Sequence, residues 1–356
     1  MDCIQSKGEF EHVVVCSKPN RYEGMETTFT NENEIDKRVR HSNVIKTRFG
    51  IVNMLVNYFN FYMLLKKTTD KERPDVVFVT SSRFITAYLG YRFSKKNGAR
   101  MVLDIRDNIF LLLQNFLPAI CSKLLQPFFN RIQSNTLSYA KHILLTSNGF
   151  LEYFSQKTSV SKFIEVVHGV PTQVADTSSA SSNTIVYAGN IGRGQMLHKF
   201  IPDLAVQLPT YDIVIIGDGN QKEKLLKAIK VRGIKNVTFI SHVSHTDLTN
   251  YYKEARFLLS HTHNLDVFKQ LIPSKLYNYA TSSKPIICCS SGYTNQKFRN
   301  TLPGIYFFEP FATQEVVKWI HLYKYDSAYD RTAFRDRYSS SKSNSIFYDI
   351  VRNTIA

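Results

Sequence analysis

The segment that decides the fold lies at residues 184–195 and reads TIVYAGNIGRGQ. Its first five residues are apolar or β-branched, which is typical of a buried strand in a parallel sheet. Three glycines follow, and they precede a predicted helix. Glycine lets the backbone approach a ligand closely, and a helix N-terminus attracts phosphate. The segment therefore predicts a strand, a phosphate-binding turn and a helix, although an ordinary tight turn would show the same pattern.

Strands and helices alternate downstream of this segment. The strand at 212–216 runs into Gly217 and Gly219 and predicts a second strand–turn–helix unit, for which a plain β-turn is the other interpretation. Further strands are predicted at 236–240, 256–260 and 285–289, with helices at 246–254 and 274–282. This alternation is typical of a doubly wound parallel sheet.

The same alternation precedes the segment. Residues 172–183 are rich in Ser and Thr and lack large apolar side chains, so they predict a linker. Upstream of it, strands are predicted at 12–16, 76–79, 101–105, 142–146 and 165–169, with helices at 83–96 and 148–156. Residues 49–66 predict an amphipathic helix, and residues 109–128 form a second strongly apolar segment that is broken at Pro118. We therefore expect two Rossmann-like domains of the α/β class with a cleft between them.

Composition narrows the function classes. The chain has 356 residues, of which 43% are hydrophobic, so intrinsic disorder is excluded. Its five cysteines form no CxxC pair and its ten histidines show no ligand spacing, so we expect no metal site. The net charge of +16 indicates an anionic partner, which could be nucleic acid, a phospholipid surface or a phosphorylated substrate. No nucleic-acid-binding signature accompanies the charge, so we expect no nucleic-acid partner.

A third motif, QLIPSKLYNY, occupies residues 270–279. Ser274 is predicted to cap a helix, which would place Lys275 in the first turn. A cation is disfavoured there by the helix dipole, so Lys275 is easier to explain if an anion shares the site. Asn278 would project from the same face as Ser274.

A candidate outside this motif is Asp107, which follows the strand at 101–105, at the edge where open parallel sheets bind ligands. It could orient a substrate hydroxyl. A helix cap, or an ion pair made by Arg106, is the structural alternative.

With these motifs in this order, the chain resembles the GT-B glycosyltransferases of family 4, and most of all the bacterial branch that builds O-antigen and capsular polysaccharide. The motifs that carry the resemblance are YAGNIG at 187–192, IGDG at 216–219, NVTFI at 236–240, PSKLYNY at 273–279 and KPII at 284–287. Upstream, PDVV at 74–77, VLDIRD at 102–107 and LTS at 145–147 fall at the expected places, and residues 334–351 are similar to the helix that returns to the first domain.

The resemblance implies an N-terminal acceptor domain at 1–171, a linker at 172–183, a nucleotide-sugar domain at 184–328 and a returning helix at 329–356. Family members usually begin with a strand and a Gly-rich loop that this chain is expected to lack. The implied enzyme is a retaining, metal-independent hexosyl- or N-acetylhexosaminyltransferase without a cofactor. Its donor would be a UDP- or GDP-type sugar, and its acceptor a polyprenyl-diphosphate-linked oligosaccharide. It would work in the cytoplasm, peripherally on the inner face of the plasma membrane, where an anionic surface attracts a basic protein.

The resemblance also assigns site residues. Arg193 and Lys275 become the candidate cations for the diphosphate, and Asp107 would face the reacting centre. The family's pair of glutamates falls at Gln270 and Asn278, whose amides keep the capacity to bind hydroxyl groups. The remaining donor-binding positions are Gly189, Asn190, Gly192, Gln195, Gly217, Gly219, Val243, Ile272, Pro273, Ser274 and Leu276.

Three alternatives stay open. A nucleotide-sugar epimerase shares the two-domain plan, although it needs acid and base groups where this chain has amides. A truncated, inactive nucleotide-sugar-binding or assembly subunit would explain the expected lack of the first loop. A nucleic-acid binder would be shown by strongly salt-dependent binding to duplex of random sequence.

Overall fold

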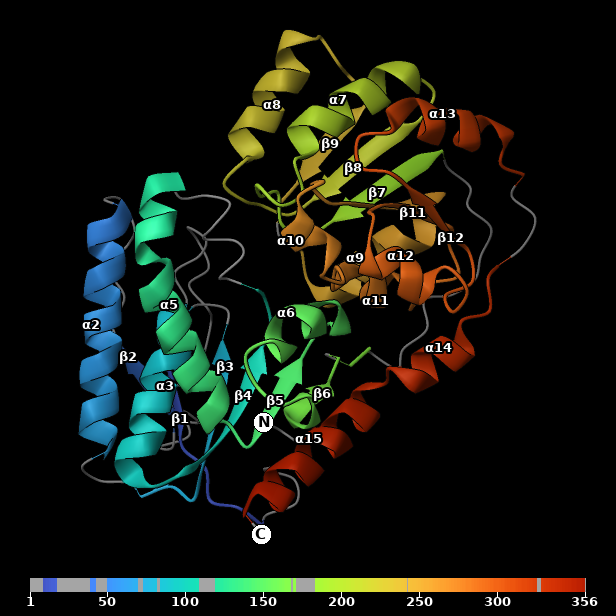
Figure 1. Cartoon of the computed structure of the whole chain (residues 1–356). Helices are drawn as coiled ribbons and strands as arrows, with labels where there is room; N and C mark the ends of the chain where they lie inside the picture. Colours follow the sequence, from blue (N-terminus) through green and yellow to red (C-terminus); the bar gives the residue numbers. More distant parts are fainter. Residues whose placement is uncertain are drawn as a thin grey trace, which may run out of the picture. The chain divides into compact units, whose positions relative to one another are not determined.

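The computed structural model describes residues 9–17, 39–42, 50–69, 73–81, 84–108, 119–167, 169–170, 183–241, 243–324 and 328–355. The chain forms two compact units. The first holds the described residues up to Thr146, Leu151–Val166 and those from Asn344 onward, and the second holds Ser147–Phe150 and Val167–Ser343. Each unit is an α/β structure around a parallel sheet, which confirms the predicted fold class (Figure 1). Of the predicted linker, only Asn183 is described.

The first unit contains a four-stranded parallel sheet in the order β3-β4-β5-β6. Its strands are β3 (Val76–Ser81), β4 (Arg100–Ile105), β5 (His142–Leu145) and β6 (Phe163–Glu165). Two further strands, β1 (Val14–Ser17) and β2 (Val39–Ser42), pair in parallel as a separate sheet.

The strand predicted at 165–169 was wrong. Val166 N still donates to Leu145 O at 2.9 Å, but Val167 and Val170 leave the sheet and belong to an apolar core of the second unit. Their burial in that core ends the strand.

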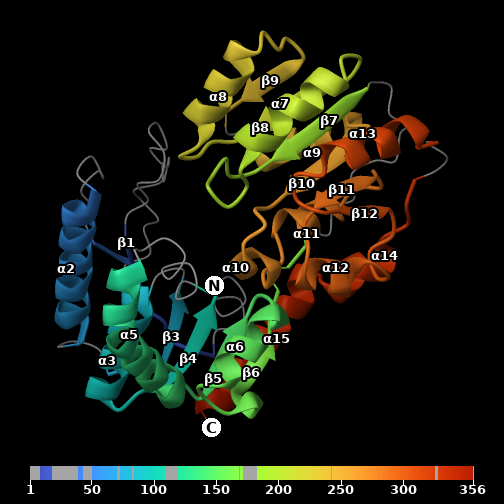
Figure 2. The same cartoon turned by 45° about the horizontal axis from the view of Figure 1, so that its top comes forward.

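Helices of the first unit include three long ones that contact each other in sequence order: α2 (Gly50–Thr69), α3 (Phe84–Asn97) and α5 (Ala119–Tyr139). They lie together in both views (Figures 1 and 2). Residues 109–118 of the second predicted apolar segment lie outside the described residues. The short α6 (Leu151–Ser155) and the end of α15 (Ser340–Ile355) complete the unit, with Ile350 of α15 packed against Val102 and Leu144 of the sheet.

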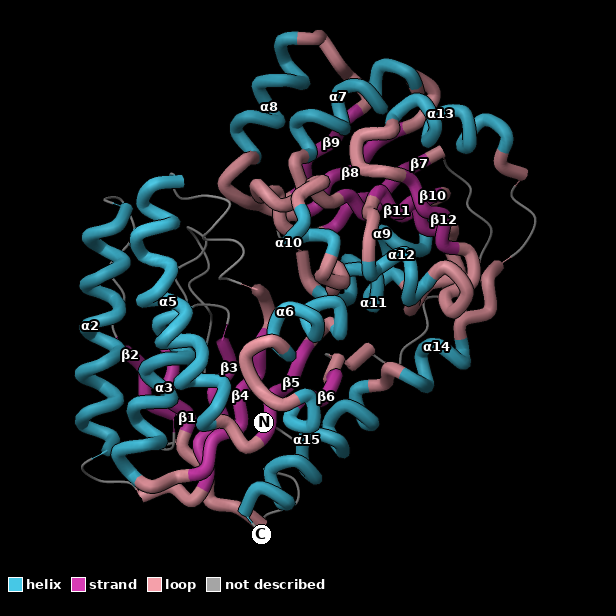
Figure 3. Tube along the Cα trace, viewed as in Figure 1, coloured by secondary structure: helices cyan, strands magenta, loops and turns pink. Residues whose placement is uncertain are grey.

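The second unit contains a six-stranded parallel sheet in the order β12-β11-β10-β7-β8-β9 (Figure 3). Because β8 and β9 are added on one side of β7 and β10 to β12 on the other, the strand order reverses at β7. Ligands of open α/β sheets bind at such a point, outside the carboxyl ends of the strands. The strands are β7 (Thr184–Ala188), β8 (Asp212–Ile216), β9 (Val237–Ile240), β10 (Phe257–His261), β11 (Ile286–Cys289) and β12 (Ile305–Phe308).

Helices cover both faces of this sheet. Ile185 and Tyr187 of β7 pack into one apolar core, while Val186 and Ala188 pack into the other, as the period of a strand requires. The first core is shared with α7 (Leu197–Gln207), α8 (Lys222–Val231) and α13 (Thr313–Leu322). The second is shared with α9 (His245–Glu254), α11 (Lys275–Tyr279), α12 (Tyr293–Phe298) and α14 (Thr332–Arg337). The short α10 (Asp266–Lys269) precedes α11. None of the described helices is long and apolar enough to span a membrane.

Candidate functional site

The two glycine turns meet at the carboxyl ends of β7 and β8. Gly189 N donates to Ile216 O at 2.9 Å, and Ile191 N donates to Asp218 O at 2.8 Å. Gly217 has a φ of +133°, and a Cβ there would lie 2.2 Å from Gly189 O. Only glycine permits this approach, so the two turns form one continuous rim of backbone at the switch point of the sheet.

The first turn is held in shape by its own amides. Gln195 Oε1 accepts hydrogen bonds from Gly192 N at 3.1 Å and from Asn190 Nδ2 at 3.3 Å. Tyr187 OH donates to Asn190 O at 2.6 Å. Asn190 and Gln195 thus bond to each other, while Arg193, between them in the chain, is exposed.

A buried histidine, which the sequence did not single out for this role, ties the turn to the end of β10. His261 Nδ1 lies 2.7 Å from Gln195 O, and Phe311 N donates to Nε2. Nε2 is therefore the acceptor and Nδ1 carries the proton. Burial lowers the pKa of His261 to about 4, so the ring is neutral at physiological pH. Its neighbour His263 adds a bond from its backbone N to Gly194 O at 2.7 Å.

Lys275 begins α11, as predicted, and its ammonium group lies beside this turn. Its Nζ is 3.5 Å from the centroid of the Tyr187 ring, and a Cβ on Gly189 would lie 3.3 Å from it. The Nζ atom is buried and has no hydrogen-bond acceptor among the residues that the structure describes. Desolvation lowers the pKa of Lys275 to about 7. A buried ammonium group that contacts an aromatic face and has no hydrogen-bond acceptor leaves its donors unsatisfied, and an anion would satisfy them.

The backbone before α11 is fixed by two hydroxyl groups. Ser147 Oγ donates to Gln270 O at 2.6 Å, and Thr294 Oγ1 donates to Leu271 O at 2.7 Å. Gly149 lies so close that a Cβ there would be 2.1 Å from Gln270 O. The side-chain oxygen of Gln270 is buried and has no partner in the described part of the chain. It is therefore available to a hydroxyl donor.

The predicted cap at Ser274 was wrong. Ser274 already has helical dihedral angles, with φ −56° and ψ −28°, and its side chain makes no capping hydrogen bond. A capping residue needs a non-helical backbone to turn its oxygen onto the first N–H groups. The placement of Lys275 in the first turn holds without the cap.

The other predicted donor positions differ in exposure. Leu276 is fully buried in the second core, so its side chain cannot reach a ligand. Pro273 is buried, Asn278 is half-buried on α11, and Val243 and Ile272 pack partly buried against the same core. No described group of three His, Cys, Asp or Glu side chains could hold a metal ion.

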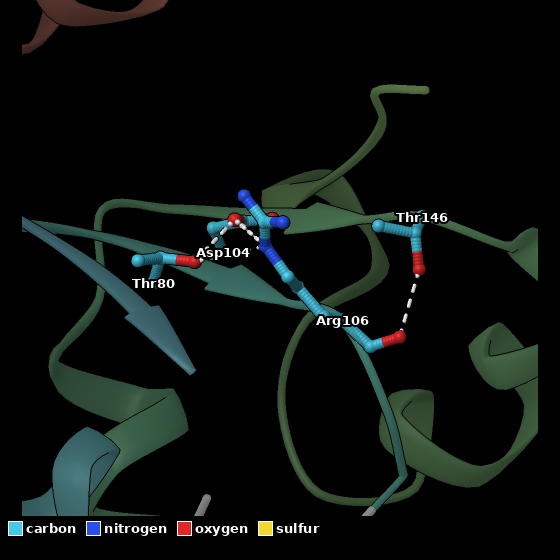
Figure 4. A network of polar contacts seen from close by, with 4 residues as sticks. All are labelled: Thr80, Asp104, Arg106 and Thr146. Carbon is cyan, nitrogen blue, oxygen red and sulfur yellow. Dashed lines mark hydrogen bonds and ion pairs between the residues drawn. The ribbon is translucent and has the colours of Figure 1, made fainter. Parts of the chain in front are cut away.

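Polar residues also gather at the carboxyl edge of the sheet in the first unit (Figure 4). Buried Asp104 accepts from Thr80 Oγ1 at 2.8 Å and from Arg106 Nε at 3.2 Å, both through Oδ2. Thr146 Oγ1 donates to Arg106 O at 3.0 Å. The structural alternative given for this segment, an ion pair of Arg106, is present. Asp107 follows and is exposed.

Two parallel Rossmann-like sheets, the second with glycine turns and a buried lysine at its switch point, give the chain the GT-B fold of solved glycosyltransferase structures. Residues 173–333 match the family model described as "Glycosyl transferases group 1", so this part of the chain is a group 1 glycosyltransferase domain and the protein is a glycosyltransferase. No curated protein matches the chain.

Solved structures show the same fold over nearly the whole chain. The Anabaena protein HepE in complex with UDP and glucose has a TM-score of 0.67 at 13% identity, covering 96% of this chain and 100% of its own. The lipopolysaccharide outer core galactosyltransferase WaaB has a TM-score of 0.59 at 16% identity, covering 96% and 99%. A glycosyltransferase from Rickettsia africae has a TM-score of 0.57 at 11% identity, covering 97% and 99%.

Proposed function

We propose that the protein transfers a hexosyl or N-acetylhexosaminyl group from a nucleotide diphosphate sugar to a polyprenyl-diphosphate-linked oligosaccharide, in the synthesis of O-antigen or capsule. The transfer retains the anomeric configuration and requires neither metal nor cofactor. The observation that carries the proposal is the buried ammonium of Lys275, which has no acceptor in the described structure and lies beside the glycine turn. The HepE structures with UDP and with UDP-glucose favour a UDP-type donor.

The proposed chemistry needs charge stabilisation more than a nucleophile. As the bond from the sugar to the diphosphate breaks, negative charge grows on the leaving group, and Lys275 and Arg193 compensate it. The acceptor hydroxyl attacks the sugar carbon on the same face and passes its proton to the departing diphosphate. Gln270 and Asn278 bind sugar and ribose hydroxyls through their amides, and Asp107 orients the reacting hydroxyl.

The remaining donor positions form the walls of the proposed site. The turns at Gly189, Gly192, Gly217 and Gly219 approach the diphosphate through backbone, while Asn190 and Gln195 keep the first turn in shape. Val243 and Ile272 supply partly buried apolar surface, and Pro273, Ser274 and Leu276 contribute through their backbone.

A membrane partner is supported by the three long helices of the first unit. Together α2, α3 and α5 carry seven basic residues and no acidic one. The basic residues are Lys66, Lys67, Arg92, Lys95, Lys96, Lys123 and Arg131. Exposed apolar side chains on α2 and α5 accompany them: Phe59, Tyr62, Leu124, Leu125 and Phe128. We therefore propose peripheral binding of this unit to the anionic inner face of the plasma membrane.

The function is tested by a thermal-shift screen of UDP- and GDP-sugars, followed by transfer of the sugar from the best donor to short prenyl-diphosphate-linked saccharides. We expect stabilisation by at least one UDP-sugar and transfer that persists in EDTA. Isomerisation of the donor without acceptor would instead identify an epimerase. Donor binding without any transfer would identify an inactive binding subunit, and absence of donor binding would contradict the proposal.

A further inference from the structure

Arg106 is a cation that the donor site does not use. It follows β4 at the carboxyl edge of the first unit's sheet, where open parallel sheets bind ligands. Its side chain is 45% exposed, whereas that of its partner Asp104 is 8% exposed. An exposed guanidinium attached to a buried carboxylate is held in one orientation while still facing solvent.

The side chain is fixed through one nitrogen only. Arg106 Nε lies 3.2 Å from Asp104 Oδ2 and 3.0 Å from Thr80 Oγ1. Nη1 and Nη2 make no hydrogen bond with any residue that the structure describes. They form the free end of the side chain (Figure 4). The two terminal nitrogens of a guanidinium match the spacing of two oxygens of one phosphate.

The backbone of Arg106 is fixed as well. Thr146, which follows β5, donates from Oγ1 to Arg106 O at 3.0 Å. Thr80 of β3, Asp104 of β4 and Thr146 therefore hold this arginine from three adjacent strands of the sheet. Since the orientation is set before a ligand arrives, little side-chain entropy is lost on binding.

We propose that Arg106 binds the diphosphate of the lipid-linked acceptor through Nη1 and Nη2. This assignment rests on the proposed function, because it takes the acceptor to carry a phosphate group. Asp104 and Thr80 are positioning residues, which hold Nε and leave the terminal nitrogens to the ligand. Because Asp104 already balances one positive charge, and exposed Asp107 follows in the chain, the affinity comes from paired hydrogen bonds rather than from net charge.

The test uses the full chain with its donor site saturated by UDP, and farnesyl diphosphate as the probe in calorimetry. Arg106→Gln should weaken farnesyl diphosphate binding by roughly 10- to 100-fold, the range expected for loss of a paired charge-assisted hydrogen bond. Arg106→Lys keeps the charge but loses the paired geometry, so it should give an intermediate loss. Binding of uncharged farnesol should be the same in all variants.

Arg352→Gln is the matched control. Arg352 is exposed on α15 in the same unit and the change removes the same charge, so farnesyl diphosphate binding should stay at the wild-type value. Unchanged binding in Arg106→Gln would overturn the proposal, and so would an equal loss for farnesol. Weaker binding of UDP in Arg106→Gln would assign the arginine to the donor phosphate instead. Failure of the wild-type protein to bind UDP would contradict the proposed function, which is a separate result.

Discussion

At the scale of single residues, the proposed donor site depends on Lys275, whose ammonium group has no hydrogen-bond acceptor among the described residues. We predict that Lys275→Met weakens UDP binding by roughly 10- to 100-fold, because the ammonium and its charge-assisted bond to phosphate are lost. Met keeps most of the apolar stem against Tyr187, so the fold should persist. Calorimetric titration with UDP measures the effect. Lys230→Met, a change at an exposed position on α8, should bind UDP normally, and normal binding by Lys275→Met would remove Lys275 from the site.

The same lysine should make stability depend on pH. Its pKa is about 7 in the folded protein because of desolvation, against an ordinary value of 10.5, so between these values the unfolded chain binds more protons than the folded one. The free energy of unfolding should therefore rise with pH from about 7 to about 10.5, and below pH 7 the full cost of burying the charge remains. Burial raises the pKa of the Cys288 thiol, which therefore also contributes to the profile, so the difference from Lys275→Met is used to isolate the lysine. Urea denaturation at each pH measures the free energy of unfolding of the wild type and of Lys275→Met. If the two free energies change with pH in parallel, the prediction is contradicted.

Sequence alone could predict that Lys275 lies in the first turn of a helix, but not which residues surround it. A cation in the first turn of a helix is a local conflict, and local conflicts can be read from neighbouring residues. His261 bonds to Gln195, 66 residues away, and Ser147 bonds to Gln270, 123 residues away. Such pairs follow from the packing of the sheet, and nothing in the local pattern specifies them. Ser274 shows that a local pattern can also mislead. Serine is a favourable capping residue, but the backbone of Ser274 is already helical, so its side chain does not cap the helix.

At the scale of elements, prediction succeeded best where a mostly apolar strand runs directly into a glycine turn. The predicted bounds of β7 and β8 agree with the structure, because in both strands four apolar residues follow a polar first residue and end at a glycine. β12 escaped prediction, since it is a four-residue strand at the edge of the sheet with three half-buried residues. The strand predicted at 165–169 failed because Val167 packs into the core of the second unit, while Val166 packs against the core of the first. Apolar pattern thus indicates that a residue is buried, but not in which core.

The contact between the two glycine turns gives a prediction at this scale. Gly217→Ala should lower the free energy of unfolding by about 2 kcal/mol or more, because its Cβ would overlap Gly189 O and its φ of +133° is strained for alanine. Since Gly189 must move, UDP binding should weaken as well. Gly233→Ala is the matched control: φ is +63° and nothing lies within 4 Å, so only the backbone strain of about 1 kcal/mol applies. Chemical denaturation and UDP titration separate the two variants, and equal losses would argue against a steric contact.

At the scale of the whole molecule, three neighbouring helices of the first unit contribute to the net charge of +16 without any acidic residue. Helices α2, α3 and α5 of the first unit carry basic residues without acidic ones, and exposed Leu124 and Phe128 lie on α5. A basic surface is attracted to any polyanion, but exposed Leu and Phe side chains are stabilised only by an apolar medium. The combination therefore favours a lipid surface over nucleic acid. It also predicts an electrostatic and an apolar contribution to membrane binding, which can be measured independently.

The electrostatic contribution should appear as selectivity among vesicles. The protein should bind vesicles that contain phosphatidylglycerol more tightly than vesicles of pure phosphatidylcholine, and salt should reduce this difference. Lys95→Gln combined with Lys96→Gln should lower the affinity by roughly 10- to 30-fold, since each lysine near the surface contributes about 1 kcal/mol. The matched control, Lys227→Gln with Lys230→Gln on α8 of the second unit, loses the same charge and should bind as the wild type does. Equal losses in both pairs would show that only net charge matters.

The apolar contribution should remain when salt screens the charges. Leu124→Ser combined with Phe128→Ser should reduce binding to phosphatidylglycerol vesicles at low salt and abolish what persists at high salt, because insertion of apolar area does not depend on ionic strength. Leu226→Ser with Val231→Ser, which removes exposed apolar side chains from α8, should change neither. If the α5 pair instead bound vesicles normally while the α8 pair did not, the second unit would hold the membrane-binding surface. The basic residues of α2, α3 and α5 would then have to be explained by a partner that needs charge alone.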